Sequence, residues 1–534
     1  MSSTRRRPPP GLVFCCAGVL SVLLPAGVAV AGDSAAVPGL GPATWYPSWD
    51  LGLHPGSGLV SVVLAIAAGL GAVAIRAGLL AVRSGLTWLS PRAVLVAAGA
   101  AVLLLTVLPP LGSADHLSYL AYGRIAAAGD DPYVVDPGTW RGGTDPVAGA
   151  IQPPWQHTPS VYGPVSTAAQ VLAAWAGDGS LRLTVWFWQI ICGLAFLAVA
   201  LTLDRLTRGN PQARARTWVL WTLNPLLLGQ VVLGGHLDVI AVAFAIGALA
   251  LASTRPVWAG LLIGAAVGSK VTIGLFALAI LWGLRHRPLP QLARHLGVMA
   301  LAGLAVLVPA HLWSGPHTYD RLHEASRQVS LASPWRLLTN ELDPVFGSGL
   351  RDVIGPVAMG LGAVLVLLLL RRMREVPTGI PADYPAGASG GASGGASGGA
   401  ETASMARAAL ALGVGWLLTT PYSLPWYDSM VWAPLALLTP TLLDGALLAR
   451  LFVLVVAYVP GRVVGMSEPV EAITLGFRRS VAPWLELAVV VTVLAWTCLR
   501  WKEFRRSEGQ STMDDVEHGR SASPVGKFDV GSAE

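Results

Sequence analysis

The sequence contains few charged residues. Charged side chains make up 12% of the 534 residues, compared with roughly 25% in an average soluble protein. Hydrophobic residues make up 53%, and the mean hydropathy is +0.59. A water-soluble fold is therefore excluded, because so apolar a chain has too little polar surface to face water.

Cysteine and the common cofactor motifs are also scarce. The four cysteines lie in apolar segments without the spacing of metal ligands, so we interpret Cys15, Cys16, Cys192 and Cys498 as packing residues. No Walker loop, dinucleotide fingerprint, serine-hydrolase elbow or zincin motif occurs. We therefore predict no cofactor and assign no metal ligand, and a requirement for a divalent metal is left open. The net charge of +6 is scattered over short loops, which argues against nucleic acid as a partner.

Long runs of Leu, Ala and Val recur along nearly the whole chain. A bilayer core about 30 Å thick needs about 20 such residues per helix, and the runs lack the alternation of barrel strands. About 14 candidate spans lie near residues 11–31, 58–76, 93–110, 183–203, 217–234, 236–253, 256–269, 271–284, 296–313, 353–370, 405–419, 430–443, 446–465 and 481–499. The sequence thus predicts an all-α integral membrane protein, a multi-spanning helical bundle surrounded by membrane lipids.

Arginine and lysine gather in alternate loops, which the positive-inside rule places in the cytoplasm. The opposite loops, chiefly 111–182 and 311–352, are longer and are expected to be extracytoplasmic in a multi-pass protein of the cell membrane. The domain prediction is a cytoplasmic N-terminus (1–10), a polytopic catalytic domain (11–500) containing a flexible cytoplasmic linker (371–404), and a disordered cytoplasmic tail (501–534). The first apolar segment also resembles a signal peptide, and its retention or cleavage is left open.

The most informative stretch follows the third candidate span and contains Asp115, Tyr119, Tyr122 and Arg124. At 100° per residue the first three share one helical face, whereas Arg124 lies nearly opposite. A carboxylate at the boundary between membrane and outer solvent can act as a general base on a hydroxyl group. The alternative is that Asp115 only stabilises a helix N-terminus.

A second stretch of the 111–182 loop combines acidic and aromatic residues. Asp131 precedes Pro132-Tyr133, and Tyr162 precedes Gly163-Pro164. Aromatic rings stack on sugar rings, and carboxylates accept hydrogen bonds from sugar hydroxyls. A structured outer loop with proline turns explains the pattern equally well.

Three further outer turns carry polar residues close to the membrane. His236 and Asp238 follow a span that Asn224-Pro225 interrupts. Ionisable groups inside the membrane are costly and usually functional, but the cost is smaller at the interface, so turn chemistry explains these two residues equally well. Lys270 separates two short apolar runs, where its ammonium group would either bind a lipid phosphate or extend to the headgroups. Trp426 and Tyr427 form either a platform for a sugar or part of an interfacial aromatic belt.

Taken together, these segments resemble a known family. The order is Asp115 with Ser-Tyr-Leu-Ala-Tyr-Gly-Arg, Asp-Pro-Tyr, Tyr162-Gly-Pro, Asn-Pro before Gly-Gly-His-Leu-Asp, Gly-Ser-Lys270, and Pro-Trp426-Tyr427. A chain with these segments in this order is similar to the actinobacterial polyprenol-phosphate-mannose-dependent α-1,6-mannosyltransferases, which have the GT-C fold. The chain departs from the family in reading Leu-Pro-Trp-Tyr where relatives often have His-Pro-Trp-Tyr.

The resemblance implies an inverting transfer of mannose from a polyprenyl-phosphate donor to a hydroxyl of a glycan or glycolipid acceptor, outside the membrane. The family's catalytic aspartate corresponds to Asp115. Lys270 is the first candidate for binding the donor phosphate and Arg124 the second. Residues expected to contact substrate are Tyr119, Tyr122, Asp131, Tyr162, His236, Asp238, Trp426 and Tyr427.

Two alternative functions remain at this stage. A polyprenyl-phosphate arabinosyl or glucosyl transferase would share the same motifs, because the donor sugar is selected by details of the pocket. A polytopic transporter or lipid flippase would instead keep polar residues in broken helices near the bilayer midplane and often shows internal repeats. Polar clusters in the outer loops and the lack of a clear repeat favour the enzyme.

Overall fold

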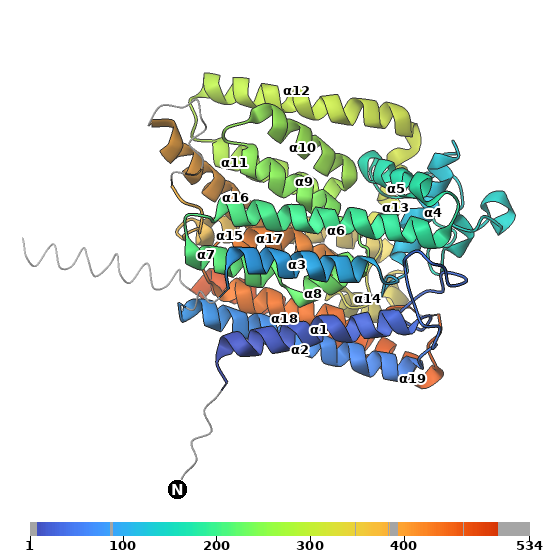
Figure 1. The fold of residues 1–534 in the computed structure, drawn as a ribbon. Coiled ribbons are helices and arrows are strands. Elements are labelled where there is room, and N and C mark those ends of the chain that lie inside the picture. Colours follow the sequence, from blue (N-terminus) through green and yellow to red (C-terminus); the bar gives the residue numbers. More distant parts are fainter. Residues whose placement is uncertain are drawn as a thin grey trace, which may run out of the picture.

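The computed structural model describes residues 8–85, 89–347, 349–382, 384, 393–462 and 464–499. Its helices lie side by side with their axes along one common direction (Figure 1). Among the described residues the only β pairing is an isolated bridge between Thr378 and Leu438. The predicted all-α class is confirmed.

Within the part of the chain that the structure describes, seven helices are long and apolar enough to cross a membrane. They are α1 (Pro10–Ala31), α2 (Ser57–Arg83), α6 (Leu181–Leu206), α12 (Leu289–Ser314), α15 (Gly349–Met373), the part Gly398–Thr419 of α16 (Ser393–Thr419), and the stretch Glu468–Leu499, which begins with α19 (Glu468–Gly476) and η8 (Phe477–Val481). Shorter apolar helices are α3 (Pro91–Thr106), α9 (Asp238–Leu251), α10 (Pro256–Ser269) and η5 (Val271–Gly274) with α11 (Leu275–Leu284). The count of about 14 spans stays a prediction.

The other described helices have between 3 and 16 residues. They are α4 (Asp115–Ala127), η1 (Trp140–Gly143), η2 (Ala148–Ala150), α5 (Pro164–Gly177), α7 (Pro211–Thr217), η3 (Trp218–Thr222), α8 (Pro225–Leu227), η4 (Leu228–Leu233), η6 (Pro316–Tyr319), α13 (Leu322–Ser326), α14 (Trp335–Phe346), η7 (Pro425–Asp428), α17 (Ser429–Ala436) and α18 (Leu442–Ala457). At the predicted break, Asn224 accepts hydrogen bonds from the N–H groups of Leu226 and Leu227.

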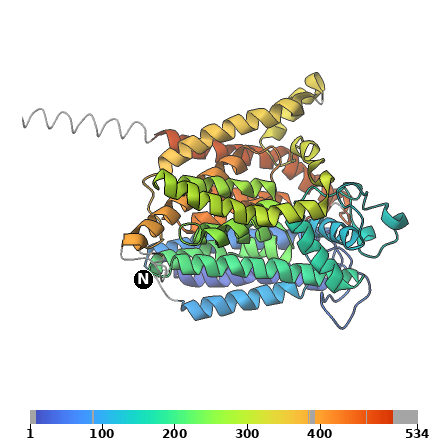
Figure 2. The same ribbon diagram turned by 90° about the horizontal axis from the view of Figure 1, so that it is seen from above.

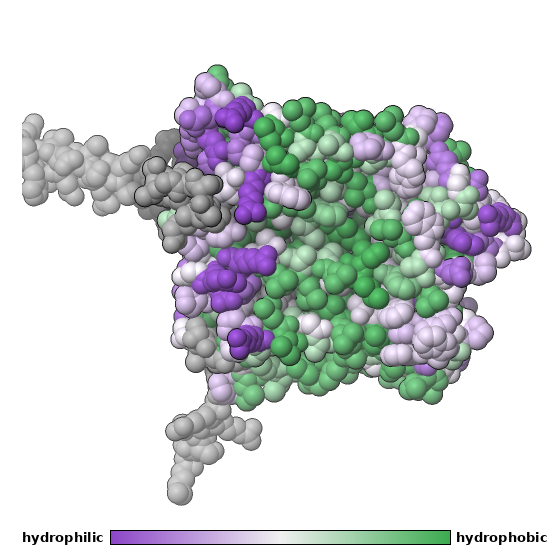
Figure 3. Space-filling model, turned by 45° about the horizontal axis from the view of Figure 1, so that its top comes forward, coloured by the Kyte–Doolittle hydropathy of each residue, from purple (hydrophilic) through white to green (hydrophobic). Residues whose placement is uncertain are grey.

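The outer surface is divided into an apolar belt and two polar ends. In Figure 3 hydrophobic residues form a broad band, and hydrophilic residues gather at its two edges. We call the end that carries α4, α5 and α13 the loop end, and the end that carries α7 the arginine end (Figure 1). Parts of the 111–182 loop extend beyond the helices at the loop end (Figure 2). An apolar belt between polar ends is the surface expected of a membrane protein.

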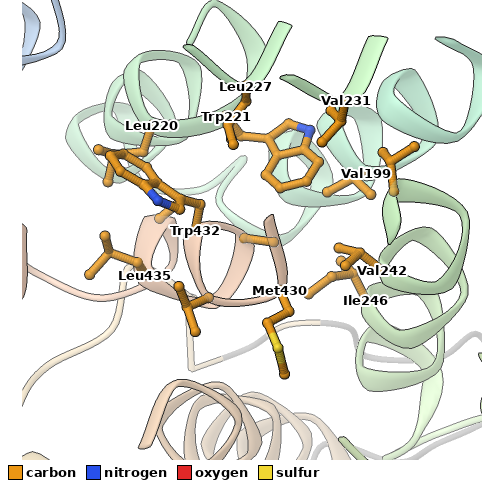
Figure 4. Close-up of a cluster of buried hydrophobic side chains, with 14 of the residues drawn as sticks. Val199, Leu220, Trp221, Leu227, Val231, Val242, Ile246, Met430, Trp432 and Leu435 are labelled. Atoms are coloured by element: carbon orange, nitrogen blue, oxygen red, sulfur yellow. The ribbon is translucent and has the colours of Figure 1, made fainter. Parts of the chain in front are cut away.

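The centre of the bundle is filled by aromatic and aliphatic side chains. Trp221 of η3 and Trp432 of α17 are fully buried among residues from α6, η4 and α9 (Figure 4). Because lipid is as apolar as such a core, close packing rather than escape from water holds membrane helices together. These contacts fix α9 and α17, whose preceding turns carry His236 and Tyr427.

Glycines let α10 and α12 approach closely. A Cβ atom at Gly264 would lie 2.6 Å from the carbonyl oxygen of Gly303, so a larger residue would separate the two helices. The chain then turns between α10 and η5 at Lys270, which has an extended backbone. The two short apolar runs are therefore a pair that meets at Lys270, as the sequence suggested.

The predicted linker over 371–404 is shorter than expected. Helix α15 continues to Met373, and α16 already begins at Ser393. Between them, Gly379 donates a hydrogen bond to the carbonyl of Leu437, and the Ile380 side chain is buried. Alanine favours helix, and Arg287 anchors the first turns of α16 by an ion pair with Glu401 at 2.6 Å. Residues 385–392 and 501–534 lie outside the described residues.

Candidate active site

A cavity of about 1060 Å³ opens at the loop end of the bundle. Its wall combines α4, residues 155–162, the turn at Lys270, the α13 region, the start of α15 and residues 416–427. Of the residues singled out in the sequence, six line it: Asp115, Tyr119, Tyr122, Tyr162, Lys270 and Tyr427. Segments that are more than 300 residues apart in sequence, such as those of Asp115 and Tyr427, therefore share one cavity.

Asp115 is the first residue of α4 and points a carboxylate into this cavity. Burial raises the pKa of Asp115 to about 6, although a side-chain hydrogen bond with Ser113 favours the ionised form. It forms no ion pair with any residue that the structure describes. At neutral pH the group is mostly ionised but holds a proton more readily than an ordinary aspartate, which suits a general base.

Tyrosine rings form the wall next to Asp115. The centroids of the Tyr119 and Tyr162 rings lie 5.1 Å apart, edge to face. Tyr122 donates a hydrogen bond of 2.8 Å from its hydroxyl to the carbonyl oxygen of Thr158. Burial raises the pKa of both Tyr119 and Tyr122, so these phenols stay neutral. The prediction that Asp115, Tyr119 and Tyr122 share one face of a helix is confirmed.

Lys270 places a positive charge on the cavity wall close to the tyrosines. Its Nζ lies 2.5 Å from Oδ1 of Asp238 and 3.6 Å from the centroid of the Tyr427 ring. Only 13% of the Lys270 side chain is exposed, so it does not extend to lipid headgroups. The Asp238 partner could not be predicted, because it begins α9 whereas Lys270 lies in the turn after α10.

His236 and Trp426 lie behind the cavity wall rather than on it. Their rings stack with centroids 3.6 Å apart. Nδ1 of His236 is 3.4 Å from the hydroxyl oxygen of Tyr119. Through these contacts η7 and the turn before α9 support the tyrosine wall.

Asp238 lies behind the wall at Lys270, and two further predicted site residues are in contact with neither the wall nor its supporting residues. Asp131 accepts a hydrogen bond of 2.8 Å from the backbone N–H of Tyr133, which is a turn contact. Arg124 lies 3.1 Å from Asp145 within the 111–182 loop. Neither lines the cavity, and for Arg124 the reason is its position on the far face of α4.

The residues at the rim of the cavity were not predicted individually. Arg321 and Arg327 of the α13 region and Arg351 of α15 line it. Arg327 pairs with Asp352 at 2.7 Å. The 311–352 loop had been expected to face outward, but no motif distinguished these arginines from ordinary surface charges. Among the described residues no group of three or more His, Cys, Asp or Glu is placed to hold a metal ion.

Comparison with known proteins assigns the family. The family described as alpha-(1->6)-mannopyranosyltransferase, N-terminal domain, matches residues 16–286, which is half of the chain. The chain belongs to this mannopyranosyltransferase family. Its matched region contains Asp115, Tyr119, Tyr122, Tyr162 and Lys270, so the family domain supplies the part of the cavity wall formed by α4, residues 155–162 and the turn at Lys270.

Individual members of the mannopyranosyltransferase family match shorter stretches. Alpha-(1->6)-mannopyranosyltransferase A of Mycobacterium tuberculosis is 32% identical over 197 residues, covering 35% of this chain and 36% of the relative. Alpha-(1->6)-mannopyranosyltransferase B of Corynebacterium glutamicum is 29% identical over 153 residues, covering 29% and 25%. A probable alpha-(1->6)-mannopyranosyltransferase of Mycolicibacterium smegmatis is 32% identical over 139 residues, covering 25% and 24%. The matches thus span about a quarter to a third of these relatives. No solved structure matches the chain.

Proposed function

We propose that this protein is an inverting mannosyltransferase that uses a polyprenyl-phosphate donor. It transfers mannose to a hydroxyl of a glycan or glycolipid acceptor on the outer face of the membrane and forms an α-1,6 linkage. The observation that carries the proposal is the cavity at the loop end, where the Asp115 carboxylate and the Lys270 ammonium face the same space. Membership in the mannopyranosyltransferase family supports the choice of sugar and linkage.

The proposed reaction is a single displacement at the anomeric carbon. The acceptor hydroxyl oxygen forms the new bond to this carbon, and Asp115 takes the hydroxyl proton. The bond between the anomeric carbon and the phosphate oxygen breaks, and its electron pair leaves with the polyprenyl phosphate. Attack from the face opposite the leaving group converts a β-linked donor into an α-linked product.

Lys270 stabilises the leaving phosphate in this mechanism. Negative charge grows on the phosphate oxygen as the bond breaks, so an ammonium group fixed nearby favours the transition state over the bound donor. The ion pair with Asp238 and the Tyr427 ring hold Nζ at the cavity wall. Asp238 shares this charge with the phosphate, as Asp352 does for Arg327 and Glu324 for Arg321 at the rim, so Lys270 and the rim arginines together provide the positive charge that binds a phosphate.

The tyrosines provide surfaces for sugar rings. Tyr119, Tyr122 and Tyr162 present aromatic edges and faces beside Asp115. Stacking of an apolar sugar face on such a ring orients the sugar, and the neutral phenol oxygens can bond its hydroxyls. Holding the donor and the acceptor close together in the correct orientation contributes a large part of the rate of such a bimolecular reaction.

The deciding experiment measures transfer by the purified full-length protein in lipid vesicles. Radiolabelled polyprenyl phosphomannose is supplied with an α-1,6-oligomannoside acceptor, and matched vesicles receive the corresponding arabinosyl and glucosyl donors. The proposal expects transfer from the mannosyl donor and an α-1,6 product with inverted configuration. Preferential transfer of arabinose or glucose would show that the protein uses another donor sugar. Movement of the donor across the vesicle membrane without transfer would show that the protein is a flippase.

The outer location of the cavity is tested separately by thiol labelling on intact cells. After replacement of the four native cysteines, Thr144→Cys reports the loop end and Ser84→Cys the arginine end; both positions are exposed hydroxyl residues. An impermeant reagent should label Cys only at position 144. Labelling at position 84 alone would place the cavity on the cytoplasmic side.

A further inference from the structure

A buried cluster of charges lies behind the cavity and takes no part in the proposed chemistry. Nε of Arg450 on α18 is 3.3 Å from Oδ1 of Asp428, and its Nη1 is 2.5 Å from Oε2 of Glu486 in the helical stretch Glu468–Leu499. Nη2 donates to the hydroxyl of Ser423. The three charged side chains are at most 2% exposed. Charges within a membrane bundle are expensive and are usually retained for function.

The contacts of Arg450 lie on both sides of one short turn. Ser423 precedes η7, and Asp428 ends it. Between them, Trp426 stacks on His236 and Tyr427 lies under the Lys270 ammonium. One guanidinium group therefore fixes both ends of the segment that presents an aromatic ring to the cavity. A planar fork with five donors can hold three partners in a fixed geometry, whereas a lysine ammonium cannot do so equally well.

A second buried ion pair provides a matched comparison. Arg216 pairs with Asp444 near the arginine end, and its guanidinium also donates to the carbonyl of Leu435. These side chains are buried to the same degree as the Arg450 cluster. None of these three residues lines the cavity, so this pair joins helices and has no turn of the site to hold.

We propose that Arg450 is a positioning residue for the transfer reaction. It holds the turn from Ser423 to Asp428 so that Tyr427 keeps Lys270 directed at the donor phosphate. The inference rests on the proposed function and adds to it a residue that does not touch the substrate. Loss of this positioning should lower turnover more than donor affinity, because misplacement by about 1 Å reduces rates strongly.

The first test compares steady-state kinetics per folded molecule for Arg450→Gln, Arg450→Lys, Ser423→Ala and the control Arg216→Gln. We expect turnover at saturating donor to fall roughly 10- to 100-fold for Arg450→Gln, with partial recovery in Arg450→Lys and a smaller loss in Ser423→Ala. Arg216→Gln should lose thermal stability but keep its turnover. If Arg450→Gln does not fold, the turnover of Arg450→Lys and Ser423→Ala decides whether Arg450 positions the site. Equal losses of turnover in the Arg216 and Arg450 variants would overturn the proposal.

A double-mutant cycle tests whether Arg450 acts through Tyr427. If it does, adding Arg450→Lys to Tyr427→Ala should cost little further turnover, whereas independent effects would multiply and contradict the proposal.

A readout that needs no transfer is the modification rate of Tyr427→Cys by a small thiol reagent in the cysteine-free protein. Arg450→Lys should change this rate severalfold, and Arg216→Lys should not. An unchanged rate overturns the positioning role, whereas wild-type protein that transfers no sugar overturns only the proposed function.

Discussion

Asp115 and Asp204 are both aspartates on helices of the bundle, yet their surroundings differ. Asp204, at the arginine end, accepts two bonds of 2.6 Å from Arg214 and one of 3.2 Å from the indole of Trp218. Asp115, at the loop end, has no ion pair among the described residues and faces a cavity. A carboxylate whose acceptors are filled can only hold the fold together. One that faces open space beside aromatic rings can react with a ligand.

Replacing each of these aspartates should separate catalysis from stability. Asp115→Asn keeps the size of the side chain but removes the base, so we expect turnover to fall roughly 10² to 10⁴-fold in a folded protein. Asp204→Asn leaves the Arg214 charge without its partner and should lower the unfolding temperature while turnover per folded molecule stays near that of wild type. Both are measured by the donor-dependent transfer assay and by thermal unfolding in detergent. Wild-type turnover in folded Asp115→Asn would remove this residue from the mechanism.

Lys270 extends the comparison between paired and open charged groups. Its ammonium pairs with Asp238 and still faces the cavity on another side. Lys270→Gln removes the charge that stabilises the leaving phosphate. Turnover at saturating donor should therefore fall by roughly tenfold or more, and more than affinity falls. Lys270→Arg keeps the charge in a different shape and should recover part of the rate. Unchanged turnover in Lys270→Gln would indicate that the rim arginines bind the donor phosphate instead.

The pH dependence of the rate should reflect the environment of Asp115. Because burial raises the pKa of Asp115 to about 6, the base is protonated and inactive below that pH. The turnover number should fall about tenfold for each pH unit below 6 and level off above it. The residual rate of Asp115→Asn should lack this step. A step near pH 4 in the wild type would mean that the carboxylate is solvated in the donor complex.

The parts of the site that lie within one helix could be predicted from the sequence. Helical periodicity alone placed Asp115, Tyr119 and Tyr122 on one face, and put Arg124 on the other. Asn224-Pro225 and the short runs around Lys270 marked breaks that the structure confirms. These features depend on local geometry, which the sequence specifies directly.

Contacts between distant helices could not be predicted in the same way. The Lys270 ion pair with Asp238 and the Arg450 cluster join helices whose relative rotation is set by packing throughout the bundle. The predicted linker was too long because composition shows only that a glycine-rich segment has little apolar surface. It does not show that the neighbouring residues 376–382 pack against the bundle, as the bonds of Gly379 and Thr439 do.

The smallest effect is expected for Arg124, the second phosphate candidate from the sequence. Arg124 is partly exposed and pairs with Asp145, which also accepts two bonds of 3.0 Å from the N–H groups of Val147 and Ala148. Arg124→Gln leaves those backbone bonds in place, and a partly exposed ion pair is worth about 0 to 1 kcal/mol. Turnover and donor KM should therefore stay within about twofold of wild type, a difference below 1 kcal/mol.

Arg327→Gln, which removes a charge from the rim, should raise the donor KM. Initial rates over a range of donor concentrations distinguish the two variants. An equal rise of KM in Arg124→Gln would show that the 111–182 loop rearranges to bring Arg124 to the donor.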